Sequence, residues 1–100
     1  MFISEIIETF QEGDSEVEIC ATADTHYDPS AEKVYVALDG FARRVGGPDG
    51  EHLPPYWLPP AERVSEHLSR NEAAAFAKDV FQSWVKKVRT AVPSALRSKL

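Results

Sequence analysis

Cysteine is almost absent from this 100-residue sequence, in which Cys20 is the only one. An intramolecular disulfide is therefore excluded, and a zinc site of cysteine thiolates has no second thiolate to use. No apolar run reaches the length of a membrane span, and the N-terminus lacks the basic start and apolar core of a signal peptide. These absences predict a cytoplasmic protein with no membrane partner.

The sequence also lacks the motifs that carry common enzyme chemistry. It contains neither a phosphate-binding loop nor a dinucleotide fingerprint. Ser65 and Ser69 lie near His67, but no nucleophile elbow surrounds them. Cys20 has no basic neighbour in the sequence to activate its thiol. We therefore predict that the protein is not an enzyme and needs no cofactor.

What the sequence does contain is the composition of one ordinary domain. The apolar share is 43% and the charged share 27%, both near the averages for globular proteins. A chain of this length can bury enough surface to fold without a disulfide or a metal. We expect residues 1–100 to form a single domain.

Charge is divided unevenly along the chain. Residues 1–40 hold ten acidic residues and one basic residue, a net charge of −9, whereas residues 41–100 hold six acidic and ten basic residues, a net charge of +4. This division can give charge complementarity, either between two halves of the fold or between two copies of it. We favour the other interpretation, in which the last basic residues only follow the preference of helix C-termini for cations.

Residues 2–12 are predicted to form a helix that ends at Gly13. Its apolar residues recur at helical spacing and are Phe2, Ile3, Ile6, Ile7 and Phe10. A strand is the alternative, because isoleucine and phenylalanine also suit strands. From Glu16 the apolar period changes to two, which predicts a β-hairpin with its turn at Asp28-Pro29-Ser30. Gly40 in the second strand predicts a bulge.

The second half of the chain ends in the clearest element of the sequence. Residues 46–50 are expected to interrupt regular secondary structure, and the proline-rich residues 53–60 are expected to be extended. Residues 61–68 fit either a short helix or an edge strand, and we favour the strand. A capping box at Ser69-Arg70-Asn71-Glu72 begins an amphipathic helix, which Pro93 ends.

Together these elements predict an α+β fold of order α-β-β-(β)-α. It consists of a small antiparallel sheet of two or three strands, with an N-terminal helix and a long C-terminal helix packed on one face. The other face of the sheet is expected to look outward. Its residues are Glu16, Glu18, Cys20, Thr22, Asp24, Lys33, Tyr35 and Asp39.

Asp24, His26 and Asp28 form the only cluster that resembles a metal site. Alternate residues of a strand share a face, so two carboxylates and an imidazole can meet one divalent ion. We favour the alternative, in which the two aspartates bracket the hairpin turn. Structural metal sites usually have a fourth ligand, and Glu18 is the only candidate for it along this face. A small metal-dependent enzyme centred on this cluster is therefore a less favoured hypothesis.

Aromatic residues on the predicted free surfaces indicate contact with another protein. Tyr35 lies on the outward sheet face, and Tyr56 and Trp57 lie in the proline-rich segment, where they are either interface anchors or a cover for the sheet edge. The charged candidates are Glu18, Lys86, Lys87 and Arg89. We predict a non-catalytic interaction module that binds a protein partner, as an adaptor or as a homodimer.

A nucleic-acid-binding domain that uses the basic C-terminal helix is the alternative function. The predicted element order is shared with double-stranded-RNA-binding domains, but Arg70-Asn71-Glu72 replaces the basic residues expected where the last helix begins. The acidic residues 1–40 also oppose binding to phosphates, so we do not favour a nucleic-acid partner. Ser98-Lys99-Leu100 matches a peroxisomal targeting signal, and the sequence leaves its use open.

Overall fold

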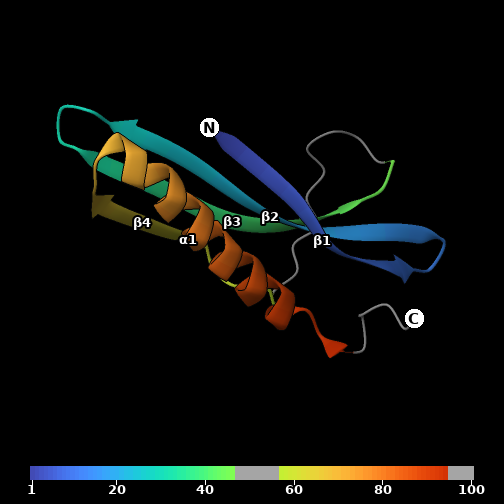
Figure 1. The fold of residues 1–100 in the computed structure, drawn as a ribbon. Coiled ribbons are helices and arrows are strands. Elements are labelled where there is room, and N and C mark those ends of the chain that lie inside the picture. The colour runs from blue at the N-terminus through green and yellow to red at the C-terminus, as the bar shows by residue number, and fades with distance from the viewer. Residues whose placement is uncertain (47–56, 95–100) are drawn as a thin grey trace.

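A computed structural model describes residues 1–46 and 57–94 of the chain, which form a four-stranded antiparallel sheet and one helix (Figure 1). The elements are β1 (Phe2–Glu12), β2 (Ser15–Asp28), β3 (Lys33–Arg44), β4 (Glu62–His67) and α1 (Arg70–Ala91). The strands lie in the sheet in chain order, and α1 runs across one face (Figure 1). The predictions of an α+β fold, an antiparallel sheet and a C-terminal helix are confirmed.

The predicted N-terminal helix is wrong, because residues 2–12 form strand β1. The element order of the described residues is therefore β-β-β-β-α, with four strands instead of two or three and one helix instead of two. The pairing of β1 with β2 shifts register between Ile6 and Glu8. This bulge inserts one residue into the alternation of faces, so the apolar spacing of the strand imitates the spacing of a helix. Gly13, with φ +62°, lies in the β1–β2 turn and ends no helix.

The predicted hairpin is confirmed as β2 and β3, which are paired from Val17 opposite Arg44 to Asp28 opposite Lys33. Oδ1 of Asp28 accepts hydrogen bonds from the backbone amides of Ser30 at 3.0 Å and Ala31 at 3.3 Å, which shapes the turn. The predicted bulge at Gly40 is wrong, since the register runs without a break through this residue.

Residues 62–67 form the edge strand β4, as favoured from the sequence, and α1 begins after its N-cap, Ser69. The capping box is only partly formed. Ser69 Oγ donates to Glu72 Oε1 at 2.8 Å, and the Ser69 carbonyl accepts from the amides of Glu72 and Ala73. The side chain of Ser69 makes no hydrogen bond to a helix amide. In the described part of the chain, no helix is long and apolar enough to cross a membrane.

The core lies between α1 and the sheet face beneath it. Trp84 is its largest fully buried side chain, and its indole Nε1 donates a hydrogen bond of 2.8 Å to the backbone carbonyl of Asp39. Burial of the polar indole nitrogen is thereby compensated. The other buried residues of this layer include Val17, Ile19, Ala21 and Ala23 on β2, Val34, Val36, Leu38 and Ala42 on β3, and Ala73, Phe81, Val85 and Val88 on α1.

Candidate functional site

The sheet has a second face, turned away from α1, which we call the outer face. Residues directly opposite each other in adjacent strands share a face, and successive residues along a strand point to opposite faces. Val34, Val36 and Leu38 point into the core, so their neighbours in the sequence point to the outer face. By this register the outer face consists of Phe2, Ser4, Ile6, Thr9 and Gln11 on β1, Glu16, Glu18, Cys20, Thr22, Asp24, His26 and Asp28 on β2, Lys33, Tyr35, Ala37, Asp39, Phe41 and Arg43 on β3, and Arg63, Ser65 and His67 on β4.

Tyr35 is an exposed aromatic side chain on the outer face, as the sequence predicts. Its side chain is 41% exposed, and its ring centroid lies 6.4 Å from that of His26 on β2. Lys33 places its Nζ 5.4 Å from the centre of the same ring, within the range of a cation–π contact. The ring of Tyr35 therefore has His26 of the adjacent strand and Lys33 of its own strand as neighbours, and it remains partly exposed.

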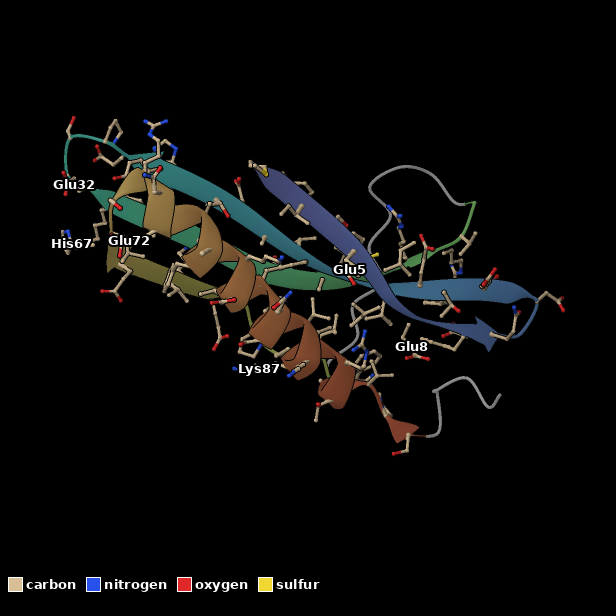
Figure 2. All side chains as sticks on the ribbon, viewed as in Figure 1. Glu5, Glu8, Glu32, His67, Glu72 and Lys87 are labelled. Carbon is tan, nitrogen blue, oxygen red and sulfur yellow. The ribbon has the colours of Figure 1, made fainter. Side chains whose placement is uncertain are left out.

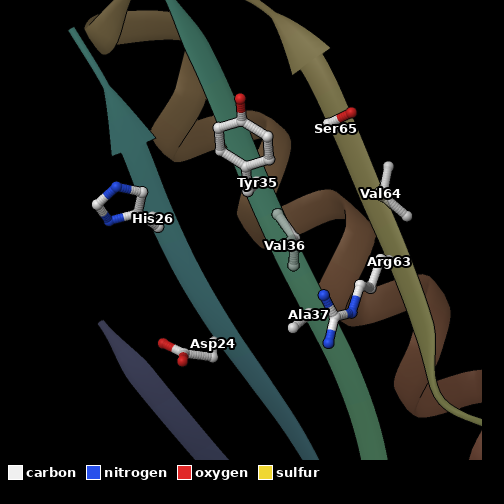
Figure 3. Close-up of a pocket in the computed structure, with 8 residues that line it drawn as sticks. All are labelled: Asp24, His26, Tyr35, Val36, Ala37, Arg63, Val64 and Ser65. Carbon is white, nitrogen blue, oxygen red and sulfur yellow. The ribbon is translucent and has the colours of Figure 1, made fainter.

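A shallow depression of about 250 Å³ lies beside Tyr35. Figure 3 shows its lining, contributed by β2, β3 and β4. Its polar lining residues are Asp24, His26, Tyr35, Arg63 and Ser65, and its apolar lining residues are Val36, Ala37 and Val64. Arg63 and Ser65 reach this site only because β4 pairs with β3, opposite Ala37 and Tyr35. An aromatic ring surrounded by donors and acceptors is typical of a protein interface.

Glu18, a predicted interface residue, is engaged within the chain. Its Oε1 lies 2.6 Å from Nε of Arg43, the residue directly opposite it on β3. Lys87, another predicted interface residue, places its Nζ 2.8 Å from Oε1 of Glu62 on β4. The pair of Glu18 and Arg43 joins residues 1–40 to residues 41–100, so part of the predicted charge complementarity is intramolecular. Glu62 and Lys87 both lie within residues 41–100.

Cys20 and Thr22 lie on the outer face but are buried, contrary to the expectation that the whole face is open. Cys20 is 0% exposed and Thr22 6% exposed. Both are on an inner strand, and Cys20 stands between the larger Ile6 and Phe41 of the adjacent strands. Burial raises the pKa of the Cys20 thiol; Arg43 acts in the opposite direction and Glu18 adds to the rise.

We expect the Cys20 thiol to be inert in the folded protein. Only the thiolate reacts with alkylating agents. Burial restricts access to the sulfur, and the raised pKa lowers the fraction of thiolate. Alkylation by iodoacetamide at pH 8 should be at least about a hundredfold slower in buffer than in urea, because it requires local opening. The folded-state rate should still rise as the pH is increased above 8. Equal rates in the two conditions would show that Cys20 is accessible.

The structure brings Asp24, His26 and Asp28 to the same face of β2 but does not gather them. They follow one another along the strand, and Oδ1 of Asp28 is occupied by the turn amides. Among residues 1–46 and 57–94, no group of three or more histidine, cysteine, aspartate or glutamate side chains is placed to hold a metal ion. The geometry offers no support for a metal centre here.

The remaining candidates lie elsewhere. Trp57 is half-buried and packs against the core, and Tyr56 lies outside the described residues, as does the C-terminal motif of residues 98–100. Lys86 and Arg89 on α1, together with Glu5 on β1, line a depression of about 490 Å³ (Glu5 is labelled in Figure 2). Sequence reasoning missed Phe2 and Ile6, because it placed them on a helix. Phe2, Ser4 and Ile6 follow one another at a spacing of two residues, which is the spacing of one strand face, and this was the available signal.

No protein-family model matches the sequence, and comparison with curated proteins and with solved structures finds no similar protein.

Proposed function

We propose that this protein is a non-catalytic interaction module whose outer face binds a protein partner. The exposed ring of Tyr35, set beside the depression that Arg63 and Ser65 help to line, is the observation that carries the proposal. Tyrosine and arginine are enriched among the residues that dominate binding energy at interfaces. Tyr35 is supported by contacts with His26 and Lys33, so less side-chain freedom is lost when a partner covers it.

The arrangement of the sheet supports this role. In an antiparallel sheet one face can pack on the core while the other remains accessible, and α1 covers only the inner face among the described elements (Figure 1). The outer face also mixes charges, since it carries Asp24 and Asp39 as well as Lys33 and Arg63. A mixed surface of this kind favours a protein partner over a polyanion, because nucleic acids require a predominantly basic surface.

The basic helix gives less support to the alternative of nucleic-acid binding. Lys87 is paired with Glu62, and its Nζ also lies 5.7 Å from the ring centre of Trp84. Glu5 and Asp79 line the same depression as Lys86 and Arg89, which reduces the positive potential there.

Truncation of Tyr35 tests the proposal. The tagged protein, Tyr35→Ala and Gln82→Ala are used in parallel to capture proteins from the source cell, with quantitative mass spectrometry. Gln82 is exposed on α1, away from the outer face, and is the matched control. We expect a partner that wild type and Gln82→Ala retain equally and that Tyr35→Ala retains about tenfold less, as for an interface tyrosine worth more than about 1.4 kcal/mol. Equal retention by both variants would contradict the proposal.

A further inference from the structure

Among the described residues, no strand pairs with the outward edge of β1, which carries exposed apolar side chains. β1 is the first strand of the sheet, and β2 is its only strand neighbour among the described residues. Phe2 is 66% exposed, Ile3 41% and Ile6 51%. Long apolar edges readily pair with a further strand, and soluble proteins usually protect them with charges, prolines or short length.

The hydrogen-bonding pattern shows which backbone groups of β1 face this edge. Met1 and Thr25 exchange two backbone hydrogen bonds, of 2.7 and 2.8 Å. Bonded and non-bonded pairs alternate in an antiparallel ladder, so Ile3 and Glu5 also bond to β2. The amides and carbonyls of Phe2, Ser4 and Ile6 therefore point away from β2. We call these three residues the β1 edge.

We infer that the β1 edge pairs with the β1 edge of a second copy of this chain, antiparallel and about a two-fold axis at Ser4. This inference rests on the proposed role in protein contact, but it names a different surface from the outer face. In this register Ser4 lies opposite the partner's Ser4, Phe2 lies opposite the partner's Ile6, and Ile6 lies opposite the partner's Phe2. All three pairs are then hydrogen-bonded pairs, and each exchanges two backbone hydrogen bonds.

The side chains fit the same register. Phe2 and Ile6 both lie on the outer face, and directly opposite residues of an antiparallel pair share a face. Each copy therefore covers the exposed phenylalanine of the other with its isoleucine, an aromatic–β-branched pair that stabilises sheets. Glu5 stands opposite the partner's Ile3, so no carboxylate directly faces another. The register shift after Ile6 ends the regular segment and so sets the length of the pairing.

Charge also favours a second copy as the occupant. Glu5 shares a depression with Lys86 and Arg89 on the helix side of β1. Two-fold pairing brings the partner's Glu5 diagonally next to Glu5, at the rim of this depression, which Asp79 also lines. The carboxylates of both copies are then near cations of both helices, in accordance with the acidic first part and basic last part of the sequence. The opposite edge, β4, is short and carries Glu62, Arg63 and Glu66, which discourage pairing there.

Substitution of Ser4 by proline tests the pairing without disturbing the monomer. The Ser4 amide points away from β2, so proline removes a hydrogen bond to the second copy and none within the sheet. Sedimentation equilibrium at tens of micromolar should give a dimer for wild type. Ser4→Pro should raise the dissociation constant about tenfold or more and keep the circular dichroism of the folded chain. A wild-type monomer throughout this range, or a dimer that Ser4→Pro leaves unchanged, would overturn the inference.

Disulfide trapping tests the register independently. Opposite residues of a bonded pair have Cα atoms about 5.5 Å apart, within disulfide reach. Under mild oxidation Ser4→Cys should therefore form a covalent dimer, whereas Ile3→Cys, which is displaced by two residues from its copy, should not. A covalent dimer of Ile3→Cys but not of Ser4→Cys would overturn the proposed register. Tyr35→Ala should leave the dimer intact, so failure of this inference is distinguished from failure of the outer-face proposal.

Discussion

Replacement of Trp84 by alanine is expected to destabilise the protein by about 3–5 kcal/mol, the range for large-to-small changes of buried aromatics. Trp84 is 2% exposed and packs between α1 and the inner face of the sheet. The substitution leaves a cavity and also removes the donor to the carbonyl of Asp39. Domains of this size have a total stability of about 5–15 kcal/mol, so the variant should be partly or wholly unfolded near body temperature. Urea denaturation followed by circular dichroism measures the effect.

Two further variants separate the parts of this effect. Trp84→Phe keeps an aromatic ring in the core but leaves the Asp39 carbonyl without its indole donor, and we expect a smaller loss of about 1–3 kcal/mol. Gln82→Ala, on the exposed side of the same helix, should change the stability by less than about 0.5 kcal/mol. A Trp84→Ala protein with an unchanged urea midpoint would show that α1 does not pack on the sheet through this residue.

Replacement of Gly40 by valine is expected to destabilise the protein, although valine is a much better strand former than glycine. Propensity alone predicts a gain of up to about 1 kcal/mol. A Cβ atom at this position would, however, lie 3.3 Å from the Cys20 carbonyl oxygen and 3.7 Å from a methyl group of Val88. The γ-methyl groups of valine would press further into this contact, and overpacking of this kind costs about 1–3 kcal/mol. Thermal denaturation measures the difference.

Ala37→Val is the matched control for this prediction. Ala37 lies on the same strand but is exposed on the outer face. Valine at this position gains the same strand propensity, and its methyl groups do not contact α1. We expect a change within about 0.5 kcal/mol of wild type, or a small stabilisation. If Gly40→Val raised the melting temperature as much as Ala37→Val, the close approach of Val88 to β3 would be refuted.

Strand periodicity predicts only part of the candidate site. Alternation along β3 places Tyr35 on the opposite face from Val34 and Val36, and this assignment follows from the sequence. Which residues surround Tyr35 does not follow from it. Arg63 and Ser65 join the site through the pairing of β3 with β4, after a connection that spans residues 45–61. The spacing of residues in the sequence does not predict this register, because the register depends on contacts between residues that are distant in the chain.

Cys20 illustrates the same limit for burial. Its place in the alternation assigns it to the outer face, which is correct, but exposure depends on the side chains of the neighbouring strands. Ile6 and Phe41 stand directly opposite it on the two sides. The identity of one of these neighbours was hidden as long as residues 2–12 were interpreted as a helix.

The sequence by itself determined the hairpin of β2 and β3 and the helix α1 with its N-cap at Ser69, and it favoured the edge strand β4 over a short helix. These elements are recognisable because their period, turn residues and capping residues all act within a few positions along the chain. Only the tertiary structure decided that residues 2–12 form a strand. Their apolar spacing suits a helix and a bulged strand alike, and local preferences differ by less than the energy of pairing along β2. That pairing also creates the β1 edge, on which the proposed self-association depends.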